Sequence, residues 1–523
     1  MAASAINWMF DSKHGAGSRL LPRWIFLRAL GLIYFSAFYS LAFQIKGLIG
    51  PDGILPARIF LEEVGRSFVT KRFWFAPTLL WISSSSHMLM AICIAGMIAA
   101  VLLFLNIWPR GMLFICFVCF LSFVSAAQDF SGYQSDGMLL EAGFISLFFA
   151  PAGFRPGWGE HSPPARASLF LLLWEWFRIY FESGMVKLLS GDPEWRHLTA
   201  MDEYYQNGPL PTWIGWYLQH LPHWFQWLTA LGTLVMELGL VLMLFLPRRF
   251  RIILFFITTV WQTVVISSAN YTFLNYLVLS LGFLLLDDRF VATFMRGKFQ
   301  VQSPLSAAPP EAGPEFRSPV HALKLALTTV VLAWIFYATT AELVFTVWRD
   351  APLPAAPVAA LEPFRVANGY GLFATMTRGR YEIEFQGSND GQNWIPYPFR
   401  YKPQALNQPP GIYAPYQPRF DWNLWFASLG PWRDNMFVVS TEERLLNNAQ
   451  DVLELFRGNP FPGAPPKQIR AVLWQYWFTS MAEKRATGNW WKRQYLGTYA
   501  PTLMQSPDGR LIVLGWPDVR PRD

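Results

Sequence analysis

Long apolar segments dominate the first two-thirds of this 523-residue chain and constrain its fold more than any other feature. About 20 apolar residues in a helix cross the hydrocarbon core of a bilayer, and nine stretches approach that length. They cover residues 24–45, 77–105, 111–128, 137–151, 167–189, 224–246, 250–267, 271–286 and 320–346. The composition agrees, because 53% of the residues are hydrophobic and only 15% are charged. The sequence therefore predicts a polytopic α-helical membrane bundle of about nine spans over residues 24–348.

The loops between these segments differ in basic charge, and this difference predicts the orientation in the membrane. With residues 1–23 in the cytoplasm, the loops on that side carry more Arg and Lys than the opposite loops. The first segment lacks a convincing small-x-small cleavage site and is typical of a retained signal anchor. Nine crossings then place residues 349–523 in a periplasm or lumen. The arginine and tryptophan usage favours a bacterial inner membrane over the endoplasmic reticulum of a eukaryote.

Ionisable residues interrupt the segment 167–189, namely Glu175, Arg178, Glu182 and Lys187. Each such group costs about 2.5–3.5 kcal/mol at the bilayer centre, so these side chains need partners. Helical spacing places the first three on one stripe, with the arginine between two carboxylates. The ammonium of Lys187 can reach the interface. The neighbouring segments offer Glu141, Glu237 and Gln262 for one buried network. Two interpretations stay open: a structural ion-pair network that locks the helices, and a polar, partly hydrated pocket.

The connection at residues 190–223 is too polar to be a membrane span and is expected on the outer side. Residues 191–193 are typical of a helix end followed by a turn, and residues 209–211 of a second helix end. Between them Trp195, Leu198, Met201 and Tyr205 fall at intervals of three or four residues, the spacing of one apolar helix face. This spacing predicts one short amphipathic helix at the membrane surface.

Cysteine and histidine give no sign of a metal or redox site. All three cysteines lie in predicted spans, and the CxxC of Cys116 and Cys119 favours a packing role. The predicted exported domain has no cysteine, so its own thiols cannot exchange disulfides there. His220 and His223 fit interfacial hydrogen bonds better than a metal pair. With no phosphate-binding glycine loop, HExxH pattern or nucleophile elbow, we expect no metal and no cofactor, and the motifs favour a protein without catalytic activity.

A proline- and alanine-rich break at residues 351–357 separates the last span from a C-terminal domain at residues 349–523. Residues 380–387 alternate apolar and polar side chains, which predicts a half-buried strand that turns into a second strand. Residues 422–429 and 468–478 show helical spacing of apolar side chains. We therefore expect an exported α+β domain with a β-sandwich-like core.

Two blocks of motifs resemble those of the lipase maturation factor family. The first comprises Trp176-Phe177-Arg178, Glu182 to Lys187, and then Asp192, Trp195, Arg196, Tyr204, Tyr205, Pro209, Pro211 and His220 of the outer loop. The second comprises Arg380-Tyr381-Glu382, Pro418 to Trp422, Asn459 to Pro462, and Arg470. The resemblance implies a polytopic membrane protein, and animal members of the family reside in the endoplasmic reticulum and are required for dimeric lipases to become active. The bundle also resembles, more distantly, the horizontally transferred transmembrane domain of vitamin K-dependent gamma-carboxylase.

The resemblance implies a role but no reaction. The first hypothesis is a membrane-anchored, chaperone-like maturation factor that assists exported enzymes such as lipases. Its candidate partner surface comprises Tyr381, Glu382, Arg419, Asp421, Trp422, Trp425 and Arg470. The alternative is a membrane enzyme or transporter acting on a lipidic substrate in a polar cavity of the bundle, and a purely structural subunit is a third option. The expected partners are membrane lipids and an exported lipase-like client, not nucleic acid.

Overall fold

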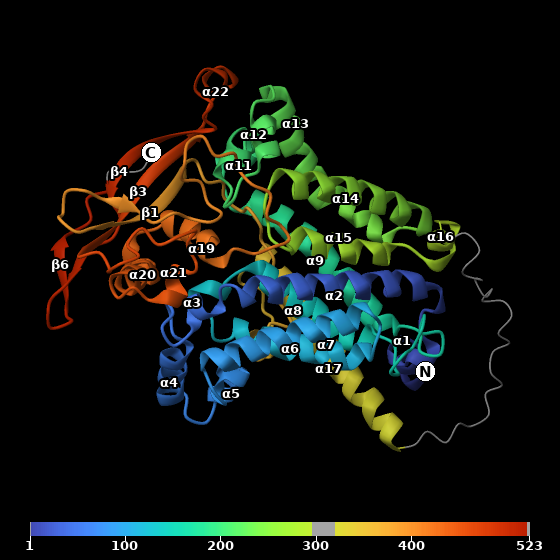
Figure 1. Ribbon diagram of the computed structural model, residues 1–523. Helices are drawn as coiled ribbons and strands as arrows, with labels where there is room; N and C mark the ends of the chain where they lie inside the picture. Colours follow the sequence, from blue (N-terminus) through green and yellow to red (C-terminus); the bar gives the residue numbers. More distant parts are fainter. Residues whose placement is uncertain (1, 295–318, 520–523) are drawn as a thin grey trace.

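The computed structural model describes residues 2–294 and 319–519. A helical bundle is followed by a C-terminal domain built on an antiparallel sheet. Figure 1 shows the bundle helices running side by side, with the C-terminal domain at one end and α1 (Ala2–Phe10) near the other. The two ends of the bundle are therefore structurally distinct.

Each of the nine predicted spans contains a helix. The bundle helices are α2 (Leu20–Ala42), α6 (Ser86–Phe104), α7 (Pro109–Val124), α8 (Gln134–Phe149), α9 (Arg166–Leu189), α13 (His223–Leu234), α14 (Arg248–Ser268), α15 (Leu274–Gly282) and α17 (Pro319–Val347). A π-helical turn, η5 (Val235–Gly239), and a 3-10 helix, η6 (Leu240–Phe245), extend α13. About five helical stretches are long and apolar enough to cross a membrane: Gly17–Ala42, Ser86–Phe104, His223–Phe245, Arg248–Ser268 and Pro319–Val347.

The helices divide into an interior and a periphery. Most residues of α8 and α9 are buried, and these two helices carry the buried ion-paired side chains Glu141, Arg178 and Glu182. The peripheral α14 instead exposes apolar side chains such as Val260 and Val264. Exposed apolar residues on membrane helices face lipid, where hydrocarbon replaces water as the solvent. The charged helices are therefore shielded from lipid by their neighbours.

Short helices connect the bundle segments. They are α3 (Ile45–Ile49), α4 (Ala57–Ser67) and α5 (Arg72–Phe75) between α2 and α6, α10 (Pro193–Arg196), α11 (Met201–Asn207) and α12 (Trp213–Gln219) in the outer loop, and α16 (Asp288–Val291) after α15. The single amphipathic helix predicted for the outer loop is wrong. Leu198 adopts a left-handed backbone conformation with φ 60°, which separates α10 from α11.

The C-terminal domain contains one antiparallel sheet whose strands differ in length. Its strands are β1 (Arg380–Ser388), β2 (Ile395–Pro396), β3 (Gln468–Phe478), β4 (Trp491–Thr498), β5 (Thr502–Gln505) and β6 (Leu511–Gly515), in the order β2-β1-β3-β5-β6, with β4 also paired to β3. The helices of this domain are α18 (Ala356–Ala359), α19 (Arg419–Ser428), α20 (Phe437–Leu446), α21 (Gln450–Leu453) and α22 (Met481–Thr487). Figure 1 places α19, α20 and α21 beside the sheet.

Three sequence predictions for this domain need correction. Residues 468–478 form β3 rather than a helix, because a nearly continuous apolar run fits either period and the nine-residue pairing with β1 decides it. The described strands all belong to one sheet, so the predicted sandwich is not formed, and α19 and α20 pack against β1 and β3 instead. Strand β1 is present as predicted but is buried along its whole length, since its acidic side chains find basic partners.

Candidate functional site

A buried ion cluster occupies the centre of the bundle. Arg178 of α9 forms ion pairs with Glu141 of α8 and, at 3.6 Å between Nη1 and Oε1, with Glu182 one turn further along its own helix. The three side chains are at most 1% exposed. A buried charge is tolerated at such depth only when it is paired, and this arginine therefore has two partners.

A segment from the C-terminal side of the last bundle helix enters this cluster. The main-chain carbonyl of Asn368 accepts a hydrogen bond from Arg178, and the Asn368 N–H donates to Glu141 at 3.0 Å. The Tyr370 hydroxyl donates to Glu141 at 2.9 Å, while the Tyr370 N–H donates to Glu182. The intramembrane charges are thus covered by the chain itself.

A second ion pair lies near the end of α9. The ammonium of Lys187 is 2.9 Å from Glu237, and it also donates to the Leu372 carbonyl at 3.0 Å. Glu237 belongs to the π-helical turn η5. Lys187 is only 2% exposed, so it does not extend to the interface as expected. Glu175 is fully buried but forms no ion pair with the described residues, and Glu141 takes the place expected for it beside Arg178.

A cavity of about 560 Å³ lies between the bundle and the C-terminal domain. Its walls include side chains of α9, α11, α13, α14, α15 and α19, together with residues 371–377. The predicted site residues that line it are Lys187, Trp195, Tyr204, Tyr205, Pro209, Glu237, Trp422 and Trp425. Gln262 also lines it and accepts a hydrogen bond from Asn275, apart from the Arg178 cluster. The volume is typical of small-molecule sites, which measure about 300–1,000 Å³.

The motif residues of the outer loop hold that loop to the C-terminal domain. Asp192 caps α10 and also accepts a hydrogen bond from the Met376 N–H. The Trp195 indole donates to the Phe373 carbonyl at 2.9 Å. His220 connects the carbonyls of Trp216 and Thr479. These contacts position the loop against residues that follow it by more than 150 positions.

The remaining motif residues of the loop fall into three groups. Tyr204 and Tyr205 pack edge to face at 5.1 Å. The carbonyl of Pro209 accepts a hydrogen bond from the guanidinium of Arg380, and Pro211 forms a β-bridge with Ala269. Arg196 is exposed. The loop is therefore held mainly by hydrogen bonds to backbone carbonyls, and the residue types in the sequence do not reveal such bonds.

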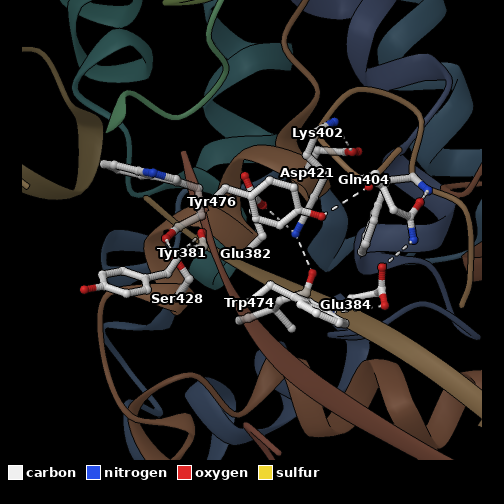
Figure 2. A network of polar contacts seen from close by, with 12 residues as sticks. Tyr381, Glu382, Glu384, Lys402, Gln404, Asp421, Ser428, Trp474 and Tyr476 are labelled. Carbon is white, nitrogen blue, oxygen red and sulfur yellow. Dashed lines mark hydrogen bonds and ion pairs between the residues drawn. The ribbon is translucent and has the colours of Figure 1, made fainter. Parts of the chain in front are cut away.

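The C-terminal domain contains its own buried polar network. Figure 2 shows Glu382, Lys402, Asp421, Gln404 and Glu384 arranged around β1 and its neighbours. Lys402 lies 2.8 Å from Glu382, and Gln404 donates to Glu384 at 3.1 Å. Burial raises the pKa of Asp421 to about 6, although the N–H groups of residues 401 and 402 donate to its carboxylate. The charges of this network compensate one another inside the domain.

Candidate metal ligands and thiols occur only as dispersed or buried side chains among the described residues. No group of three His, Cys, Asp or Glu side chains there has the arrangement of a metal site. Cys93, Cys116 and Cys119 are free and buried within the bundle. The buried thiols are separate from the C-terminal domain.

Comparisons with known proteins match both parts of this architecture. A family model described as the lipase maturation factor transmembrane domain matches residues 21–293, which is more than half of the chain. The chain belongs to the lipase maturation factor family. The model of the lipase maturation factor C-terminal domain matches residues 366–501. No solved structure matches this fold.

Relatives within the family align over nearly the whole chain. Lipase maturation factor 2 of Gallus gallus is 32% identical over 96% of this chain and 84% of its own length. Lipase maturation factor 1 of Bos taurus is 30% identical over 97% of this chain and 93% of its own, and that of Homo sapiens is 30% identical over 93% and 88%. The chain is thus a multi-pass membrane member of the family.

The boundary of the second family domain coincides with a structural junction. This C-terminal lipase maturation factor domain begins at residue 366, immediately before the segment that covers Arg178 and Glu182. Its Arg419 pairs with Asp136 of α8 through two contacts of 2.7 Å. The family's two domains are therefore joined by buried charges.

The partner surface predicted for the maturation factor is not a surface in this structure. Tyr381, Glu382, Arg419, Asp421, Trp422 and Trp425 are all at most 7% exposed. Arg470 is half-buried, with its guanidinium 4.0 Å from the Trp394 ring. The motif residues are buried because they hold the domain together and to the bundle.

Sequence reasoning missed residues 368–372 altogether. Their Asn-Gly-Tyr-Gly-Leu sequence carried one usable signal, since glycine allows close approach of the backbone to its neighbours. A Cβ added at Gly369 would lie 3.2 Å from a Glu342 oxygen, and one at Gly371 would lie 3.2 Å from Val186. Two glycines around one tyrosine thus mark where the chain enters between helices.

Proposed function

We propose that this protein is a membrane-anchored maturation factor that assists the folding or assembly of exported enzymes such as lipases. The observation that carries the proposal is the alignment of relatives named lipase maturation factor over 93–97% of the chain, across both family domains. The role requires binding of a client polypeptide without chemical turnover.

The client-binding surface that we favour is the outer edge of β6. Four consecutive apolar side chains of this strand, Leu511 to Leu514, are each 40–46% exposed, and Trp516 beyond them is 66% exposed. In the described sheet β6 pairs with β5 alone, so its second edge is open. Open strand edges bind extended segments of other chains through main-chain hydrogen bonds. Figure 1 places β6 on the side of the domain remote from α14 and α16.

Co-expression with a secreted lipase tests this role. Ile512→Glu places a charge on the β6 surface, and we expect the specific activity of the lipase to fall several-fold while its synthesis stays unchanged. The matched control is Ile59→Glu on α4, an isoleucine that is 60% exposed in the bundle half. Unchanged lipase activity with Ile512→Glu would reject the β6 edge, and unchanged activity without the whole protein would reject the maturation role.

We also propose nine membrane crossings with a cytoplasmic N-terminus and an exported C-terminal domain. The basic loops and the separation of α1 from the C-terminal domain in Figure 1 support this orientation. Composition favours a bacterial inner membrane, whereas the matched relatives come from animals. A single cysteine in place of the exposed Asp508 would react with an impermeant maleimide in intact cells if the domain is exported, because the native thiols are buried. Labelling only after lysis would indicate the opposite orientation of the domain.

A further inference from the structure

We propose that the cavity between the bundle and the C-terminal domain binds a neutral acyl lipid, of the diacylglycerol class. Its volume of about 560 Å³ lies within the usual range of ligand sites, about 300–1,000 Å³. The inference concerns a ligand of the resting protein and is independent of the identity of any client.

The position of the cavity favours a ligand that arrives from the bilayer. Two peripheral helices contribute to its wall, through Thr229 of α13 and through Trp261, Val264 and Val265 of α14. α14, and α13 together with its extension through η5 and η6, are long and apolar enough to cross a membrane. Val264 is 52% exposed and marks the rim of the cavity towards lipid. A hydrocarbon chain can therefore enter sideways without crossing water.

The walls favour a hydrocarbon body. Aromatic side chains surround the space, including Tyr204, Phe373, Trp422, Trp425 and Phe426. Phe426 is 44% exposed although it belongs to a helix otherwise buried against the sheet and bundle. Aromatic rings offer large apolar areas that acyl chains cover. An apolar occupant would remove this exposed surface from water.

The charges of the lining exclude an anionic head group. Lys187 and Glu237 are the charged side chains among the described lining residues, and they lie 2.9 Å apart in an ion pair. No cation of the lining is thus left for a phosphate. The lining instead offers neutral hydroxyl groups, such as those of Thr375 and Thr377, which suit ester and alcohol oxygens. A neutral, ester-bearing lipid matches both the apolar walls and these hydroxyl groups.

The π-helical turn η5 supports a binding role for this cavity. Such turns occur mostly as short bulges and are frequent at functional sites. This one carries Glu237 into the wall, where it holds Lys187 against the Leu372 carbonyl and 5.2 Å from the Trp195 ring. Residues 371–377 line the cavity and belong to the C-terminal family domain. A bound lipid would therefore contact both family domains at once.

The test uses the full-length protein in phosphatidylcholine nanodiscs that contain a photoreactive diacylglycerol. We expect crosslinks on α13, α14 and residues 371–377, and competition by unlabelled diacylglycerol. Thr229→Phe fills the wall and should lower labelling about tenfold, equivalent to about 1.4 kcal/mol. Ala374→Phe, in the part of the lining that belongs to the C-terminal family domain, should do the same. The matched control Thr263→Phe lies at an exposed position of α14 outside the lining and should label like wild type.

Each variant is compared at equal monodispersity and equal melting temperature, so that unfolding is not mistaken for lost binding. Equal labelling by photoreactive phosphatidic acid would overturn the neutral-lipid assignment. Labelling spread over the outer helix faces, or left unchanged in both filled variants, would overturn the cavity as the site.

Discussion

The ion pair between Arg419 and Asp136 gives the sharpest prediction, because it joins the two family domains. Arg419 opens α19, and its two Nη atoms lie 2.7 Å from the two carboxylate oxygens of Asp136. Nη1 also donates to the Phe130 carbonyl at 2.8 Å. Both side chains are at most 1% exposed. Removal of one partner from a buried pair costs about 3–5 kcal/mol, because the other charge stays buried and unpaired.

We therefore expect Arg419→Met to weaken docking of the C-terminal domain by about 3–5 kcal/mol, a factor of about 10² or more in the undocked population. Asp136→Leu should cost a similar amount. The double variant Asp136→Leu/Arg419→Met should recover most of the loss, because two apolar side chains carry no unpaired charge. The cycle of four proteins isolates the coupling between the two sites.

Limited proteolysis in nanodiscs measures the effect. When reclosing is fast relative to cleavage, the cleavage rate of the domain junction follows the population of the open form. Each single variant should be cleaved about 100-fold faster than wild type, and the double variant should approach the wild-type rate. If Arg419→Met alone is cleaved like wild type, or if the two losses simply add, the pair does not hold the domains together.

Three further predictions concern the C-terminal domain, its contact with the bundle, and the thiols. Asp421 has a folded pKa of about 6, raised by burial, so the folded state binds the proton more tightly than the unfolded state and stability falls as pH rises through the range of about 4 to 6. Asp421→Asn should remove this slope, worth up to about 3 kcal/mol, from the pH dependence of thermal unfolding, and an unchanged slope would contradict it. Gly47→Ala should destabilise the protein by about 1–3 kcal/mol in the same assay, since a Cβ there meets the Asp451 carbonyl, whereas Gly65→Ala should not. Replacement of all three cysteines by alanine should leave the specific activity of a co-expressed client unchanged, and its loss at normal protein abundance would point to thiol chemistry.

The helical bundle was predictable because its signal is local. A run of some 20 apolar residues needs no knowledge of its neighbours to be assigned as a helix, and every predicted span contains one. Strand β1 was predictable for the same reason, since the alternation of residues 380–387 has a period of two. Strand β3 was not, because its residues are apolar on both sides and only pairing with β1 defines it.

For the candidate site, the sequence predicted only that the buried charges of α9 need oppositely charged or hydrogen-bonding partners. The cost of burying Arg178 implied a carboxylate nearby, and Glu182 on the same helix supplies one. The other partners, Glu141 and the Asn368 carbonyl, come from 37 and 190 residues away in sequence. No local pattern encodes such distances. The buried state of Arg419 was hidden likewise, because its carboxylate partner lies 283 residues before it.

Residues 366–377 explain why the charges of α9 persist in an apolar helix. This short segment accepts from Arg178, donates to Glu141 and Glu182, and accepts from Lys187 through Leu372. Its residues 371–377 also line the cavity, and Phe373 and Met376 among them contact the outer loop. Buried polar groups seldom add stability over apolar packing, but they penalise every alternative arrangement in which they lose their partners. The α9 charges therefore fix the position of the C-terminal domain relative to the bundle. Any shift of that domain opens the cavity and separates the ion pairs at the same time.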